Sequence, residues 1–488
     1  MKKIKFTNKL LTFVFIALSS SVSAQELTLH NMEFLGQRHS LNPALNPITR
    51  FYLTFYDVGL GFSNSFAIND LRKFDNNSDS FTWSTGKFLE SMRRNNATKL
   101  DQLVNFSFGV RVTPKLFIHA AAAEKFQFRL NYPYDLFAFL LQGNLADENV
   151  GKPLNIGGFR VNSTAYLDFS AGAAYQVNCN LSVGARLKYL KGLANIYTKT
   201  AKFNITTNSE YYQVTFDNDL DFRTTLPDDN QDFSDLLKQK NLGYGIDLGA
   251  TYLMLDKKLL LTGSLLDLGF ISWSEGGKRY YNKSQTKTFE FRGFNSDALS
   301  GNSDMFEKLV DTITQTFDLG DEPSARYKTN LIPKIYLSGS YEIWKGNRVG
   351  AMMYGEISNK RLSTAWSVNG QMRLGRILNL QGNISLMNRR LSNIGLGLAA
   401  NLGPIQWWIV TNNAGFLFFN PLDTRTVHLR TGVNIVFAYG KDKKNPCSPD
   451  YIPPGERNKK QTNKKGRKSQ PDSPPDTPPT EAQPAETK

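Results

Sequence analysis

Residues that could supply acid–base or nucleophilic chemistry are few in this sequence. Its 488 residues include only four histidines and two cysteines. A hydrolase needs a nucleophile, a general base and a group that orients the base. No histidine stands in a recognisable serine or aspartate context, and no HExxH, phosphate-binding loop, EF-hand loop, CxxC pair or paired-carboxylate motif is apparent. We therefore expect no catalytic residue, no metal ligand and no cofactor.

A second set of polar residues follows a strict alternation. Residues 362–386 read LSTAWSVNGQMRL, then GRI, then LNLQGNISL. A period of two predicts β-strands, and the short separation between the two arms predicts an antiparallel hairpin. One face of the hairpin is apolar, and the other carries amides, serines and one arginine. The polar residues that we expect to face a wet lumen are Asn369, Gln371, Arg373, Asn379, Gln381 and Asn383.

A soluble β-sandwich also alternates apolar and polar residues, so the hairpin alone does not place the apolar face. Its arms are about a dozen residues long, which suits a strand tilted across a bilayer. Its polar face lacks the Lys and Glu that cover soluble sheets. Similar hairpins recur along almost the whole chain. We therefore predict an all-β protein: a transmembrane antiparallel β-barrel of about 14 strands over residues 50–440.

The connections between the predicted strands support the same architecture. Short and long connections alternate, as they do between the two sides of an outer-membrane barrel. In the strand near Leu265 and Leu266 the alternation blurs, which predicts a β-bulge or an apolar patch of lumen. The short connections lie at residues 113–115, 177–180, 255–258, 345–347, 375–377 and 403–404, and the long ones at residues 67–100, 131–158, 200–242, 274–327 and 413–426.

The last predicted strand covers residues 427–439. Its polar face carries His428, Arg430 and Asn434, which we expect to face the lumen. A closing strand with alternating aromatic residues resembles the signal that the barrel-assembly machinery recognises. In this strand the signal residues are Gly432, Phe437 and Tyr439.

The N-terminal part of the sequence has two segments. Residues 1–24 combine four lysines, an apolar run and a small-residue end at Ala24, which predicts a secretory signal peptide. Residues 25–49 contain two X-Pro steps, which disfavour a helix or a central strand. We expect this second segment to enter the lumen as a plug that includes Asn42, Pro43 and Ala44.

The C-terminal residues 441–488 have no periodic pattern and are rich in Lys and Pro, which predicts a disordered periplasmic tail. The tail either tethers the barrel to anionic lipid, peptidoglycan or a protein partner, or is a solvated extension. The formal charge of +15 does not predict nucleic-acid binding, because an exported chain does not meet nucleic acid. The basic cluster of the tail comprises Lys459, Lys460, Lys464, Lys465, Arg467 and Lys468.

Several phrases resemble an uncharacterised family of Bacteroidota outer-membrane barrels that is related to FadL-like and PorV-like barrels. The resemblance implies a 14-stranded barrel with Asn42, Pro43 and Ala44 in an internal plug, and it implies no activity. The phrases are LNPA at residues 41–44, GARLKYLKGLAN at 184–195, GYGIDLGATY at 243–252, SLLDLGFISW at 264–273 and NIGLGLAANLGPIQ at 393–406.

Two functions remain open for a barrel in the outer membrane. FadL-like relatives pass hydrophobic small molecules, which suggests a channel for small hydrophobic or amphipathic solutes. PorV-like relatives serve type IX secretion, which suggests a docking subunit of a secretion, motility or barrel-assembly complex whose tail binds a periplasmic partner. Fold analogy does not choose between the two.

Overall fold

The computed structural model of the chain divides into two units, residues Met1–Gly440 and Lys441–Lys488. The predicted signal peptide, Tyr439 and the predicted tail with its basic cluster lie outside the described residues. Among the described residues, no helix is long and apolar enough to cross a membrane. The structure describes residues 26–45, 47, 49–75, 80–143, 149–208, 214–227, 233–282, 319–323, 325–358, 361–375, 377–387, 390–414, 422 and 424–437.

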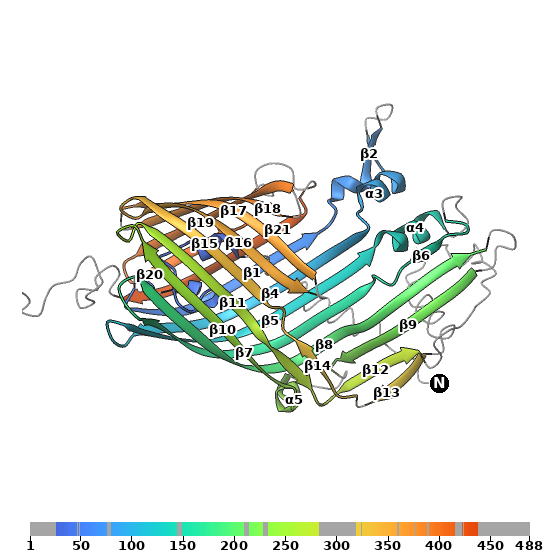
Figure 1. The fold of residues 1–488 in the computed structure, drawn as a ribbon, viewed down its shortest axis with the longest axis horizontal. Helices are drawn as coiled ribbons and strands as arrows, with labels where there is room; N and C mark the ends of the chain where they lie inside the picture. Colours follow the sequence, from blue (N-terminus) through green and yellow to red (C-terminus); the bar gives the residue numbers. More distant parts are fainter. Residues whose placement is uncertain are drawn as a thin grey trace, which may run out of the picture. The chain divides into compact units, whose positions relative to one another are not determined.

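Fourteen antiparallel strands close into a barrel, which confirms the predicted fold class (Figure 1). Each strand pairs with the next, and the last pairs with the first from Phe51↔Phe437 to Ser63↔Thr426. The strands are β1 (Phe51–Asn64), β4 (Asn95–Arg111), β5 (Leu116–Pro133), β7 (Arg160–Gln176), β8 (Leu181–Thr207), β10 (Leu242–Met254), β11 (Leu259–Trp273), β15 (Lys334–Trp344), β16 (Asn347–Ser358), β17 (Arg361–Leu374), β18 (Leu378–Met387), β19 (Arg390–Leu402), β20 (Ile405–Thr411) and β21 (Thr426–Phe437).

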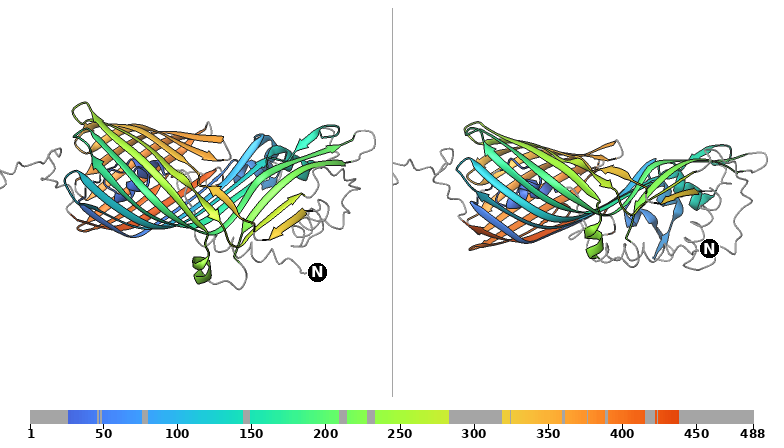
Figure 2. Two further views of the ribbon diagram at one scale, coloured as in Figure 1. Left: turned by 60° about the horizontal axis from the view of Figure 1, so that its bottom comes forward. Right: turned by 90° about the horizontal axis from the view of Figure 1, so that it is seen from below.

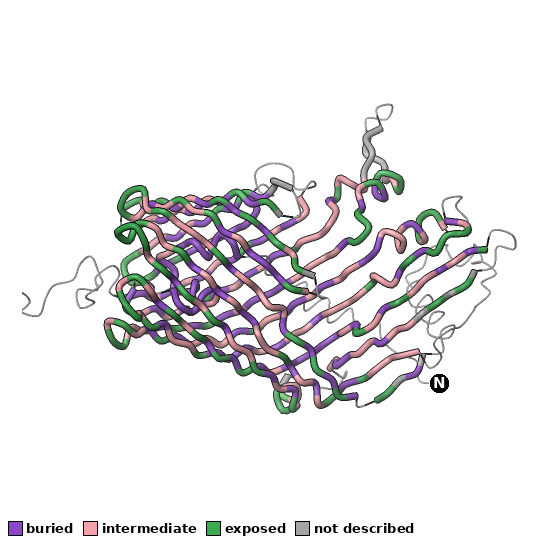
Figure 3. Tube along the Cα trace, viewed as in Figure 1, coloured by how far each residue is buried: buried purple, intermediate pink, exposed green. Residues whose placement is uncertain are grey.

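The two faces of the wall have opposite polarity. On β17, Trp366 and Val368 are 55% and 67% exposed, whereas Asn369 is 6% exposed. The same alternation of exposed and buried positions runs through the other strands of the ring (Figure 3). Because the apolar residues point outward and the polar residues inward, the outer face suits lipid and the inner face suits a hydrated lumen.

At one end of the barrel several strands extend beyond the closed ring (Figure 1). β8 pairs with β10 over its first part and then with β9 (Val214–Thr225) over Asn195 to Thr207. Parts of the predicted long connection at residues 200–242 are therefore sheet, and β-branched residues such as Ile205 and Thr207 continue the alternation there. The other outer elements are β6 (Pro153–Asn155), β12 (Gly277–Asn282), β13 (Leu319–Pro323), β14 (Tyr327–Asn330), the hairpin of β2 (Arg72–Asp75) and β3 (Ser80–Trp83), and the helices η2 (Ile68–Leu71), α3 (Thr85–Ser91), α4 (Tyr134–Gln142) and α5 (Phe233–Lys238).

Shifts in register interrupt several of the described strand pairs, and two of them lie beside buried acidic residues. One lies in β1 between Thr54 and Tyr56, and the other lies where β10 pairs with β11 around Asp247. The second confirms the bulge predicted near Leu265 and Leu266. An extra residue in one strand shifts the alternation locally, and Asp57, Asp247 and Asp267 are all buried at these positions.

The N-terminal segment, residues 26–45, lies inside the barrel (Figure 2). It contains a short helix α2 (Leu27–His30) and a 3-10 helix η1 (Gly36–Ser40). Its apolar side chains, such as Leu29 and Phe34, pack with Tyr336, Trp408 and other inward-facing residues in one buried cluster. This part of the lumen is therefore filled by an apolar core shared between the segment and the wall.

The outward polarity of β17 predicts an asymmetric response to charge. We expect Val368→Arg, near the middle of the strand, to lower the free energy of unfolding in lipid vesicles by about 2–4 kcal/mol. The same change at Ile377, in the turn after the strand, should lower it by about 0–1 kcal/mol. Urea titration of the two variants measures the difference, and equal losses would contradict a lipid-facing position for Val368.

Candidate functional site

The candidate site is the lumen, where the N-terminal segment meets the wall and a cavity adjoins it. Asn42 holds one end of the segment. Its Nδ2 donates to the carbonyl oxygens of Ala250 (3.3 Å) and Gly263 (3.1 Å), and its Oδ1 accepts from the backbone N–H of Ala44 (2.9 Å). The Asn42 amide thus bridges the segment to β10 and β11.

Two glycines of the wall make room for this contact. A Cβ added at Gly184 would lie 2.4 Å from the carbonyl carbon of Pro43, and one at Gly249 would lie 2.0 Å from Oδ1 of Asn42. Both distances are far below van der Waals contact, so the segment docks there only because β8 and β10 have no side chain at these positions. Asn42, Pro43 and Ala44, the predicted plug residues, all lie at this contact.

The other end of the segment docks on the opposite part of the wall. Thr28 donates its N–H to Oδ1 of Asn412 (3.1 Å) and its hydroxyl to the carbonyl of Thr411 (3.0 Å). Thr28 and Met32 lie against Gly395 and Gly397 of β19, where an added Cβ would overlap them. The segment is therefore fixed at both ends by hydrogen bonds and by close packing against glycines of the wall.

A buried ion-pair group joins the segment to the seam between β1 and β21. Arg430 donates to both carboxylate oxygens of Asp57, at 2.7 Å each, and also to Glu26 of the segment. Asn105 donates a further hydrogen bond to Asp57 (2.8 Å). Asp57 is fully buried, so these partners must offset the cost of removing its carboxylate from water.

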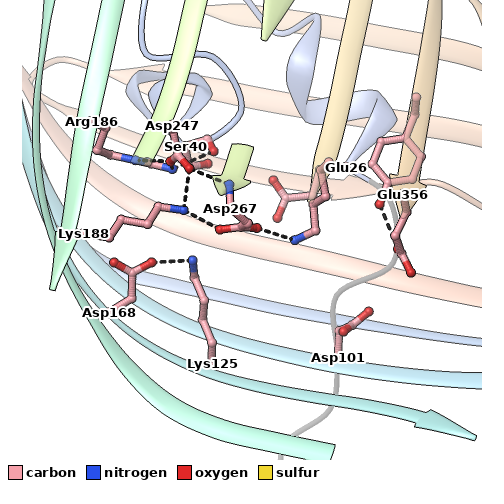
Figure 4. A network of polar contacts seen from close by, with 12 residues as sticks. Glu26, Ser40, Asp101, Lys125, Asp168, Arg186, Lys188, Asp247, Asp267 and Glu356 are labelled. Carbon is pink, nitrogen blue, oxygen red and sulfur yellow. Dashed lines mark hydrogen bonds and ion pairs between the residues drawn. The ribbon is translucent and has the colours of Figure 1, made fainter. Parts of the chain in front are cut away.

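A second charged group runs along β8, β10, β11 and β15 (Figure 4). Lys188 contacts Asp247 (2.8 Å between Nζ and Oδ1) and also Asp267, which in turn contacts Lys334 (3.1 Å between Oδ2 and Nζ). Arg186 donates to Asp247 and to the carbonyl oxygen of Ser40 (3.0 Å). The carbonyl contact ties the N-terminal segment to this group.

A cavity of about 1,170 Å³ lies over the segment. Gln37, His39 and Ser40 of the segment line it. His39 stacks on His119 of β5, with 4.5 Å between ring centroids. The charged residues on its wall include Asp101, Lys125, Arg129, Asp168, Lys188, Asp267, Lys334 and Glu356. A wall of this kind suits a polar or amphipathic ligand better than a purely apolar one.

Beyond the ring, Asp221 of β9 is held by two arginines. Nε of Arg223 lies 3.0 Å from one carboxylate oxygen, and a guanidinium nitrogen of Arg279 lies 3.1 Å from the other. Burial opposes ionisation of this carboxyl group, but the hydrogen bonds from the arginines outweigh it and lower its pKa. The outer sheet therefore carries an ionised carboxylate at neutral pH.

The residues predicted to face the lumen are inward but do not form one site. Asn434 exchanges hydrogen bonds with Gln37 of the segment, and Arg430 makes the ion pairs described above. Arg430 alone among them lines the large cavity. Arg373 is partly buried, and its Nε lies 3.4 Å from Oδ1 of Asn379. Of the residues predicted as the assembly signal, Gly432 lies against Trp408 and Phe437 is exposed. The buried members of the lumen-facing set are Asn369, Gln371, Asn379, Gln381, Asn383 and His428.

The acidic members of the charged groups were missed by the sequence analysis. Asp57, Asp247 and Glu356 are single charges within otherwise uncharged stretches of strand. A charge inside a strand that crosses a bilayer is expected to face the lumen, and this signal could have identified them. Within the described part of the chain, no group of three or more His, Cys, Asp or Glu residues could hold a metal ion.

The Arg430 group makes a stability prediction. Arg430→Met leaves the Asp57 carboxylate buried without a cation, and we expect a loss of about 3–5 kcal/mol in the free energy of unfolding, measured by urea titration in vesicles. Arg348→Met is the control, because Arg348 also pairs with a carboxylate of the segment, Glu33, at 3.2 Å. That carboxylate is partly exposed, so the control should lose about 1 kcal/mol or less.

Solved structures with a similar arrangement of strands include, by their descriptions, a FadL homologue and a toluene transporter. A FadL homologue from Pseudomonas aeruginosa is 9% identical, with a TM-score of 0.43 over 86% of this chain and 100% of the other. The toluene transporter TbuX of Ralstonia pickettii is 10% identical, with a TM-score of 0.40 over 83% and 95%. We draw no functional conclusion from likenesses at this level.

Sequence comparison gives a firmer result for the family. No curated protein matches the chain at a significant level. A family model described as a family of unknown function, DUF5723, matches residues 43–412. This match begins at Pro43, within the segment that docks in the lumen, and ends just after β20. Because it covers more than half of the 488 residues, the chain belongs to the DUF5723 family.

Proposed function

We propose that the protein is an outer-membrane channel for small amphipathic solutes and that its own N-terminal segment closes the channel. The observation that carries the proposal is the position of this segment. Residues 26–45 occupy the lumen of a closed barrel, and a cavity of about 1,170 Å³ adjoins them. A solute that enters the cavity meets the segment before it can cross the barrel.

The segment is held in the lumen by non-covalent contacts that can be exchanged, which supports a closure that moves. The described contacts between the segment and the wall are hydrogen bonds, ion pairs and apolar packing. Each polar contact contributes about 1 kcal/mol when exchanged for water, and more when a charge is involved. A structure of this kind opens by exchanging such contacts, without breaking the hydrogen bonds that close the wall.

The amphipathic class of solute is favoured by the composition of the cavity wall. Charged groups such as Lys125 and Asp168, 2.6 Å apart, line it, and so do the aromatic rings of Tyr52 and Tyr336. An apolar solute would have to displace water from these charges without replacing its hydrogen bonds. An amphipathic solute can place its polar end there and its apolar end on the rings.

The closed wall and its apolar outer face also support a location in the outer membrane. A closed barrel leaves no unpaired strand edge in a bilayer, and its exposed apolar residues need lipid contact. The predicted signal peptide would deliver the chain for insertion. The alternative, a docking subunit bound through the tail, depends on residues outside the described part of the chain, and no described contact favours it.

The closure is tested by a substitution that disturbs only the docked segment. Gly184→Ala places a Cβ against the backbone of Pro43, which we expect to destabilise docking by about 1–3 kcal/mol. The fraction of time that the channel is open should rise by roughly tenfold for each 1.4 kcal/mol. Conductance of the purified protein in planar bilayers with potassium chloride measures this fraction.

Gly382→Ala is the matched control. Gly382 lies on the lipid-facing side of β18 in register with Gly370, and an added Cβ meets no atom within 4 Å. Its conductance should equal that of the unmodified protein. If Gly184→Ala is folded and its conductance is also unchanged, the N-terminal segment does not close the channel.

A further inference from the structure

We infer that Lys99 and Arg129 form a binding site for the carboxylate group of a solute, and that the side chain of Glu356 occupies this site in the closed barrel. The inference rests on the proposed function, because it names the class of solute that the cavity would accept. It is drawn from three ion-pair partners and from their places in the ring.

Both cations converge on a single carboxylate oxygen. Oε1 of Glu356 lies 3.0 Å from Nζ of Lys99 and 3.4 Å from Nε of Arg129. The other oxygen, Oε2, accepts a hydrogen bond from the hydroxyl of Tyr354 (3.0 Å). Arg129 and Glu356 are almost completely buried, whereas the side chain of Lys99 is 23% exposed. All three residues line the large cavity.

The strand order places these partners on opposite sides of the barrel. Lys99 lies on β4 and Glu356 on β16. Between β4 and β16, six strands lie on one side of the ring (β5, β7, β8, β10, β11 and β15) and six on the other (β17, β18, β19, β20, β21 and β1). The ion pair therefore crosses the lumen instead of following the wall.

A contact across the lumen must break when a solute passes between the two walls. After the break, Glu356 keeps the hydroxyl of Tyr354 and faces Lys334, its cross-strand partner on β15. On the other wall Arg129 keeps Asp101. Lys99 has no second carboxylate partner among the described residues, so this wall carries one more positive than negative charge.

The excess charge selects the chemistry of the solute. A carboxylate can replace that of Glu356 between Lys99 and Arg129 and can restore the charge balance that opening removes. A cationic solute would have to approach the positively charged wall, and a neutral one would leave Lys99 without a counter-charge. One carboxylate matches the single excess charge.

The test uses three probes of similar shape: 4-phenylbutyrate, 4-phenylbutanol and 4-phenylbutylamine. Binding of each to the full-length protein in detergent is measured by calorimetric titration. Glu356→Gln removes the competing charge but keeps the size of the side chain. We expect it to raise the affinity for 4-phenylbutyrate at least tenfold and to leave the affinity for 4-phenylbutanol unchanged.

Lys99→Gln is the complementary variant, and it avoids leaving the buried Asp101 without Arg129. It should lower the affinity for 4-phenylbutyrate at least tenfold. Lys202→Gln is its control, because Lys202 also lines the cavity but its side chain is 75% exposed. That substitution should leave the affinity unchanged. The inference is overturned if Glu356→Gln binds 4-phenylbutylamine more tightly than the unmodified protein does, or if it binds none of the three probes more tightly.

The outcome can be separated from that of the proposed function. If Gly184→Ala opens the channel and Glu356→Gln binds 4-phenylbutyrate no more tightly than the unmodified protein does, the proposed channel is supported and the carboxylate site is contradicted. If Glu356→Gln gains the expected affinity and Gly184→Ala conducts no more than Gly382→Ala, the carboxylate site is supported and the segment does not act as the closure.

Discussion

The hydrogen bonds between β1 and β21 are the constraint on which the rest of the structure depends. In a bilayer every backbone N–H and C=O must find a partner within the protein, so the sheet must close. Closure of fourteen strands leaves an interior too wide to be filled by the wall's own side chains. The N-terminal segment fills part of this interior, and the charged groups face the remainder.

The charged groups follow from the same constraint. Inward positions of the strands are shielded from lipid but are also partly shielded from water by the segment. A buried carboxylate such as that of Asp57 is tolerated only with a cation and further hydrogen bonds around it. Pairing of charges thus holds the segment to the wall.

The sequence predicts the architecture better than the site. A period of two in stretches such as residues 362–386 specifies strands, faces and hairpins locally. The pairing of Lys99 with Glu356 depends on the closure of the whole ring, and no local pattern encodes it. The bulges at Asp57 and Asp247 change which residues face inward by one position. The contact of Pro43 with Gly184 needs the tertiary fold, because a glycine in a strand has many possible reasons.

The N-terminal segment contacts parts of the wall that lie far along the chain. Thr28 binds Asn412, 384 residues later, and Glu26 binds Arg430. These partners do not exist as a surface until the last strands have joined the sheet. Contacts between residues so distant in sequence form late in folding, since loop closure opposes them. Insertion of the segment therefore belongs to the final stage of assembly, and its docking distinguishes a finished barrel from an unfinished one.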